Sequence, residues 1–94
     1  MAGKSWQRPL LAKLRRWATK NFPIEIPVRC YMRPAKRLES LYGLFDLNDD
    51  RESAKILISD SCNSKSQLIY TFIEEWAHAR TMNLVTDPTT QAGV

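Results

Sequence analysis

A short segment near the C-terminal end of the sequence holds the residues best suited to chemistry. Glu74 and Glu75 precede His78, the only histidine in the chain. On a helix, His78 stands four positions after Glu74 and three after Glu75, so the three polar groups converge. A zinc-dependent hydrolase uses two metal ligands one turn apart, with a carboxylate beside the first that takes a proton from metal-bound water. The alternative is a solvent-facing helix surface, on which a Glu–His pair contributes roughly 0.2–0.5 kcal/mol.

The surrounding helix carries a resemblance. It reads Leu68-Ile69-Tyr70-Thr71-Phe72-Ile73-Glu74-Glu75-Trp76-Ala77-His78-Ala79. This resembles the active-site helix of SprT-like zinc metallopeptidases, including small phage-encoded members, which characteristically reads L-I-x-T-L-I-H-E-W-A-H-A. The resemblance extends over residues 6–82 and implies a minimal zincin fold. It also implies hydrolysis of unstructured or DNA-bound protein segments, with Glu75 as the general base and His78 as a metal ligand.

The chain departs from the family's H-E-x-x-H at its first histidine, where it has Glu74. A carboxylate binds zinc through oxygen, but a second negative charge beside Glu75 disfavours ionisation of both groups unless a cation is present. The family takes a third ligand from beyond the helix, where Asp87 is the only carboxylate, and Cys62 is the only thiol just before the helix. The expected metal ligands are therefore His78, Glu74 and Asp87, for zinc or a harder ion such as manganese. A degenerate member without a metal, or a chain lacking a later segment with the third ligand, are the alternatives.

The charge distribution suggests a function of another class. Residues 1–37 contain ten Lys and Arg and one acidic residue, whereas residues 38–94 contain four Lys and Arg and nine acidic residues. Lys13, Arg16 and Lys20 approximate one face of the first helix, and further basic residues follow nearby at Arg15, Arg29, Arg33, Lys36 and Arg37. A basic region of this kind favours binding to DNA or to an acidic protein. The simpler explanation is that these residues decorate the solvent-exposed face of the helix.

Length and composition limit the alternatives further. With 94 residues, of which 44% are hydrophobic and 26% charged, the chain is expected to form one soluble domain. No apolar run approaches the length of a membrane span, and the N-terminus lacks the features of a secretory signal, so we expect a cytoplasmic protein, in the host cytoplasm if it is viral. Cys30 and Cys62 are expected to be free thiols.

These candidate residues must be positioned by five elements. Apolar spacing predicts a helix over residues 6–20 with Ser5 as its N-cap, and strands over residues 25–33, 40–47 and 54–59. The last two strands are expected to form an antiparallel hairpin, and a capping box at Ser64 to open the motif helix, with Trp17 and Trp76 facing the core. The fold class is α+β. The three strands lie between the two helices in the sequence and are expected to form a mainly antiparallel sheet. Residues 1–82 form the domain, and residues 83–94 are expected to be a loose tail.

Overall fold

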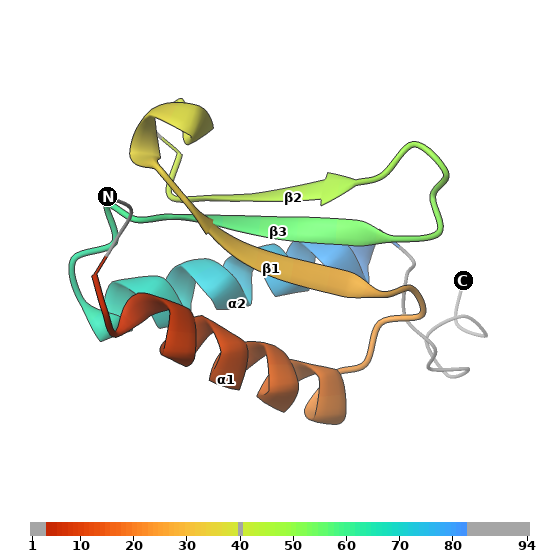
Figure 1. Ribbon diagram of the computed structural model, residues 1–94. Helices are drawn as coiled ribbons and strands as arrows, with labels where there is room; N and C mark the ends of the chain where they lie inside the picture. Colours follow the sequence, from red (N-terminus) through yellow and green to blue (C-terminus); the bar gives the residue numbers. More distant parts are fainter. Residues whose placement is uncertain (1–3, 40, 83–94) are drawn as a thin grey trace.

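Helices and strands follow one another in the predicted order. The computed structural model describes residues 4–39 and 41–82 (Figure 1). Its elements are α1 (Gln7–Asn21), β1 (Val28–Arg33), the 3-10 helix η1 (Ala35–Leu38), β2 (Gly43–Leu47), β3 (Ala54–Ser59) and α2 (Lys65–Thr81). The α+β class is confirmed. The expected tail over residues 83–94 lies outside the described residues.

The sheet has the strand order β1-β3-β2. The hairpin is confirmed, because β2 pairs with β3 in antiparallel fashion. However, β1 pairs with β3 in parallel, from Val28 beside Ala54 to Arg33 beside Ser59, so the sheet is mixed rather than mainly antiparallel. After β1 the chain turns back through the segment that contains η1, so β2 runs in the direction opposite to β1. Since β3 reverses direction again and lies between them, it runs parallel to β1.

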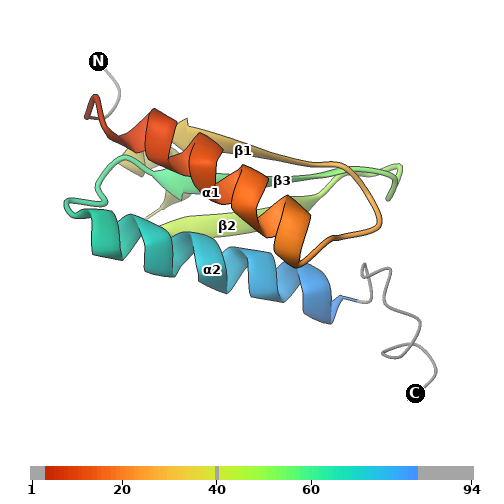
Figure 2. The same ribbon diagram turned by 90° about the horizontal axis from the view of Figure 1, so that it is seen from below.

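Both helices cover the same face of this sheet (Figure 2). Strand residues that face the helices alternate with residues that face away, as the period-two spacing predicts. The core between the helices and the sheet contains the main buried apolar side chains, which are Leu11, Ala18, Val28, Met32, Ile56, Ile58, Leu68, Phe72 and Trp76. The placement of Trp76 in the core is thus confirmed. Trp17 is 45% exposed, so its predicted core position is wrong; Ala18, the next residue along the helix, is buried instead.

The start of α2 agrees with the sequence. Ser64 is its N-cap, and its Oγ accepts a hydrogen bond of 3.1 Å from the Gln67 backbone N–H. The Gln67 side-chain oxygen accepts from the N–H of Asn63 at 2.9 Å, one residue earlier than in a standard capping box. This arrangement fixes the direction in which the motif helix leaves the loop.

The start of α1 differs from the prediction. Trp6 is the N-cap and makes no side-chain cap hydrogen bond, so the assignment of Ser5 is wrong. Instead the buried Gln7 accepts from the Lys4 N–H at 2.8 Å and donates through Nε2 to the carbonyl oxygens of Asp60 and Cys62. One amide thereby joins α1 to the loop that precedes α2, and a side-chain cap is replaced by a tertiary contact.

The opposite face of the sheet carries no α-helix in the described part of the chain, and the short 3-10 helix η1 lies on that side at one end of the sheet (Figure 1). Its side chains alternate with the core residues, and they include Arg29, Tyr31, Arg33, Leu44, Asp46, Lys55 and Leu57. Lys55 and Asp46 form an ion pair at 3.8 Å across β3 and β2. Among the described residues, no helix is long and apolar enough to cross a membrane.

Candidate functional site

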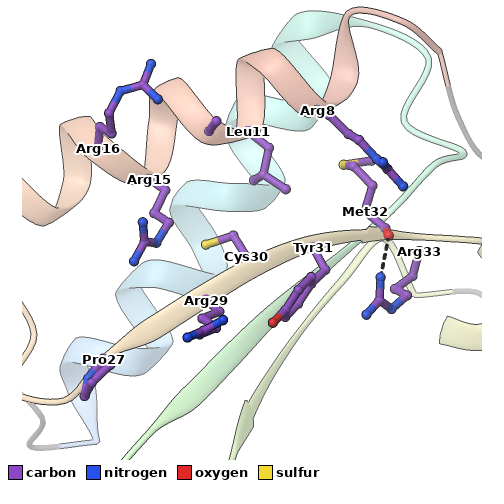
Figure 3. A pocket seen from close by; sticks show the side chains of 11 residues that line it. Arg8, Leu11, Arg15, Arg16, Pro27, Arg29, Cys30, Tyr31, Met32 and Arg33 are labelled. Atoms are coloured by element: carbon purple, nitrogen blue, oxygen red, sulfur yellow. Dashed lines mark hydrogen bonds between the residues drawn. The ribbon is translucent and has the colours of Figure 1, made fainter.

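A large hollow of the described structure lies between α1 and β1. This α1–β1 groove has a volume of about 750 Å³, and five of its lining residues are arginines. Arg8, Arg15 and Arg16 come from α1, and Arg29 and Arg33 come from β1 (Figure 3). Among the described residues, no acidic side chain lines the groove. Nor does any of these arginines form an ion pair with a carboxylate within residues 4–39 and 41–82.

The spacing of the arginines follows from the two elements. Arg8 and Arg15 are seven positions apart on α1, so they lie on the same side of the helix two turns apart. Arg29 and Arg33 are four positions apart on β1, and their side chains leave the strand on the face away from α1 (Figure 3). The groove therefore has guanidinium groups on both sides of the β1 edge.

Between these two rows of arginines the groove is lined by apolar groups. Leu11 and Met32 are 3% and 5% exposed, and Ala12 and Cys30 lie beside them. Burial raises the pKa of the Cys30 thiol to about 11, against the opposing effect of the Arg15 charge. Cys30 is therefore an uncharged thiol at neutral pH, and the floor of the groove carries no negative charge.

Two of the arginines are held by the edge of β1. Arg15 Nε donates to the Val28 carbonyl oxygen at 2.9 Å, and Arg33 Nη1 donates to that of Met32 at 3.1 Å. The Arg33 guanidinium also lies over the Tyr31 ring, 4.6 Å from its centroid. A guanidinium has five N–H donors, so each group retains donors for an anion while its position is restrained.

The structure divides the predicted basic face of α1. Arg16 lines the α1–β1 groove, whereas Lys13 lines a smaller hollow together with Trp6 and Lys65. Lys20 is exposed and lines neither hollow. The three predicted nucleic-acid-binding residues are thus not gathered at one site.

Sequence reasoning missed Arg8 as a member of the site. Its helical spacing from Arg15 and Arg16 was the available signal. The pairing of that row with Arg29 and Arg33 depends on α1 packing beside β1, which no spacing along the chain reveals.

On α2 the three residues of the motif do not form a common cluster. Glu74 and His78 are exposed, whereas Glu75 is half-buried and reaches towards β2. Burial raises the pKa of Glu75 above its ordinary value, and the Glu74 charge acts in the same direction, while His78 and the Phe45 backbone N–H oppose it.

Gly43 makes this approach possible. A Cβ at this position would lie 2.6 Å from Thr71 Cγ2 and 3.0 Å from Glu75 Cγ, so only glycine leaves room for the helix. Because Tyr42 pairs with Ser59 through the Ser59 N–H, alternation along β2 directs the N–H of Phe45 to the free edge of the sheet. Glu75 therefore covers an edge-strand donor, which is a common structural role for a charged residue beside a sheet edge.

The described residues do not complete the predicted metal site. Within residues 4–39 and 41–82, no three His, Cys, Asp or Glu side chains are grouped so that they would hold a metal ion. Asp87 lies outside the described residues. Cys62 is fully buried, and burial raises the pKa of its thiol, which disfavours the thiolate that a metal requires. Both Cys30 and Cys62 are free, as predicted.

Comparison with known proteins adds no relative. No protein-family model, no curated protein and no solved structure matches this chain.

Proposed function

We propose that this protein is a nucleic-acid-binding module that holds phosphate groups in the α1–β1 groove. The observation that supports this proposal is the set of five arginines along the groove, with no acidic residue among its lining. A guanidinium pairs with two phosphate oxygens at once through its fork of N–H donors. Several such groups, kept apart from carboxylates, attract a polyanion over a range of about a Debye length.

The two-sided arrangement favours a polymer of phosphates over a single anion. The arginines of α1 and those of β1 lie on opposite sides of the strand edge, with the apolar floor along α1 (Figure 3). A chain with regularly repeated charges reaches both sides together, whereas one small anion reaches only some of the arginines. An acidic protein segment is the competing ligand, and the experiments below include it.

Charge reversal within the groove tests the proposal. We expect Arg16→Glu combined with Arg29→Glu to weaken binding of a fluorescein-labelled oligonucleotide about 10-fold or more at about 50 mM salt, measured by fluorescence anisotropy. Both residues are exposed, and neither side chain makes a hydrogen bond to the rest of the described chain, so folding should be preserved. The control is Lys20→Glu combined with Lys65→Glu, which changes the net charge equally outside the groove. Equal loss in both pairs, or no binding by the natural sequence, would contradict the proposal.

A second candidate function is the metallopeptidase-like role implied by the SprT-like resemblance, with a peptide or protein as substrate. The position of Glu75 favours it, because this carboxylate lies beside an edge strand and is influenced by both Glu74 and His78. The described residues lack a complete ligand set, so we assign no catalytic step to them.

Elemental analysis of the purified protein tests this second candidate. A metallopeptidase-like protein should contain stoichiometric zinc or manganese, and Glu75→Gln should abolish any cleavage of an unfolded substrate protein. Absence of both metals, or cleavage that persists in Glu75→Gln, would exclude this role for Glu75.

A further inference from the structure

We infer that the ligand of the α1–β1 groove is single-stranded nucleic acid, bound through its bases as well as its phosphates. This inference rests on the proposed function and specifies its substrate class. Two features of the groove carry it. One is the apolar floor between the arginines. The other is the aromatic ring of Tyr31, on the face of the sheet opposite the α-helices.

A duplex would not bury the apolar floor of the groove. The outer surface of a double helix presents phosphates and sugars, and its bases are stacked within it. Ala12 is exposed and Cys30 is partly exposed, and beside the buried Leu11 and Met32 they present an apolar surface that an unpaired base covers by van der Waals contact. With arginines on either side, bases lie on the apolar surface while the phosphates that flank them meet guanidinium groups.

Tyr31 extends this surface around the strand edge. It lies between Arg29 and Arg33 in the sequence, and all three side chains leave β1 on the face opposite the α-helices (Figure 3). Arg33 holds the ring from one side, with its guanidinium 4.6 Å from the ring centroid. An aromatic ring held by one guanidinium, with a second arginine on the same face of the strand, is an arrangement in which a base stacks and its phosphates are neutralised.

Neither element presents the shape that reads a duplex. Major-groove recognition uses a helix or a two-stranded β-ribbon that projects and inserts its side chains. Here α1 packs through Leu11 and Ala18 against the rest of the molecule, and its arginines face the edge of β1 rather than open solvent alone. A flexible single strand adapts to a groove between a helix and a strand, whereas a rigid duplex does not.

Direct comparison of the two nucleic acids tests the inference. Fluorescence anisotropy is measured with a labelled 12-nucleotide oligothymidylate, with a mixed-sequence single strand of equal length, and with the duplex of that strand. We expect both single strands to bind at least about 10-fold more tightly than the duplex. Tyr31→Ala should weaken single-strand binding about 5- to 100-fold and leave duplex binding unchanged, because stacking on the ring is lost. Tyr31→Phe should retain binding.

The controls separate the possible failures. Tyr70→Ala removes a tyrosine that is 65% exposed on α2, outside the groove, and should leave the affinity unchanged. Circular dichroism melts establish that Tyr31→Ala is folded. A duplex that binds as tightly as the single strand, with no effect of Tyr31→Ala, overturns this inference and leaves the proposed function standing. Absence of binding to any nucleic acid overturns both, and displacement of oligothymidylate by polyglutamate at equal charge concentration would assign the groove to an acidic protein.

Discussion

Burial of the Glu75 carboxylate beside β2 lowers the free energy of unfolding at neutral pH. The carboxyl group is half-buried between α2 and the edge of β2, and burial raises its pKa. Between the unfolded-state pKa and this higher folded-state pKa, the folded protein holds more protons than the unfolded protein. The free energy of unfolding therefore falls as pH rises through that window, and the penalty is complete above the folded-state pKa.

Replacing Glu75 with an uncharged analogue should remove this penalty. We expect Glu75→Gln to raise the free energy of unfolding at pH 7, and the gain to disappear near pH 3, where the natural carboxyl is protonated in both states. Urea denaturation at a series of pH values measures this difference. Glu52→Gln, in the exposed turn between β2 and β3, is the matched control and should show no such gain. A loss of stability in Glu75→Gln at pH 7 would mean that its charge is favourable in the fold.

Cys30 gives a second prediction at the scale of one residue. Because burial raises the pKa of its thiol to about 11, the reactive thiolate is scarce at pH 8. Iodoacetamide should modify Cys30 at least about 10-fold more slowly in the folded protein than in urea, as followed by peptide mass spectrometry. A bound oligonucleotide should slow the reaction further, because Cys30 lines the α1–β1 groove. Equal rates in folded and unfolded protein would show that the groove floor is open to solvent.

At the scale of the elements, α2 approaches β2 closely because position 43 of the strand is a glycine and has no side chain. Gly43→Ala would place a methyl group 2.6 Å from Thr71 Cγ2. Thr71 is buried and β-branched, so its methyl group has little freedom to move within α2. We expect Gly43→Ala to lower the free energy of unfolding by about 1–3 kcal/mol.

A double-mutant cycle measures whether the cause is this contact. Thr71→Ser removes Cγ2 and retains the hydroxyl group. In the Thr71→Ser background, Gly43→Ala should cost less than in the natural sequence, as determined by thermal and urea unfolding. An unchanged cost would place the strain elsewhere along β2.

Much of each element was predictable from the sequence, because apolar periodicity is a local property. The range of β3 agrees residue for residue, and Ser64 begins α2 as its side chain and that of Gln67 predict. The start of α1 was not predictable, since Gln7 bonds to Asp60 and Cys62, far along the chain. Likewise, the β1–β3 pairing joins residues 26 positions apart in the sequence, so their parallel direction follows from how the chain returns and not from either strand's pattern.

The candidate site was predictable only in part for the same reason. The excess of positive charge in residues 1–37 indicated the region that contains the α1–β1 groove, and Arg16, one of the residues chosen, lines that groove. Lys13 and Lys20 share the helix with Arg16, but α1 packs against β1 on one side only, so those two side chains face other surroundings. On α2, helical spacing placed Glu74 and His78 correctly on one side, but the close approach at Gly43 turned Glu75 towards the sheet edge.

For the whole molecule, the proposed function predicts a defined response to salt. If the five arginines of the groove each meet one phosphate, the logarithm of the affinity for a single strand should fall against the logarithm of salt concentration with a slope of about −3.5. Affinity should then fall about 100-fold between about 50 and 200 mM salt.

Removing two of these contacts should reduce the slope in proportion. In Arg16→Glu combined with Arg29→Glu, we expect a slope of about −2, whereas the Lys20→Glu and Lys65→Glu pair should keep the natural value. Anisotropy titrations at four salt concentrations give both slopes. A slope near zero for the natural sequence would show that binding does not proceed through phosphate contacts.

The strand order also dictates when the sheet is able to form during synthesis. Both pairings involve β3, and β1 and β2 have no pairing with each other. Until residues 54–59 have been synthesised, β1 and β2 each lack the strand with which they pair. Both ladders need β3, so the sheet is able to form only once residues 54–59 have been synthesised, and not strand by strand.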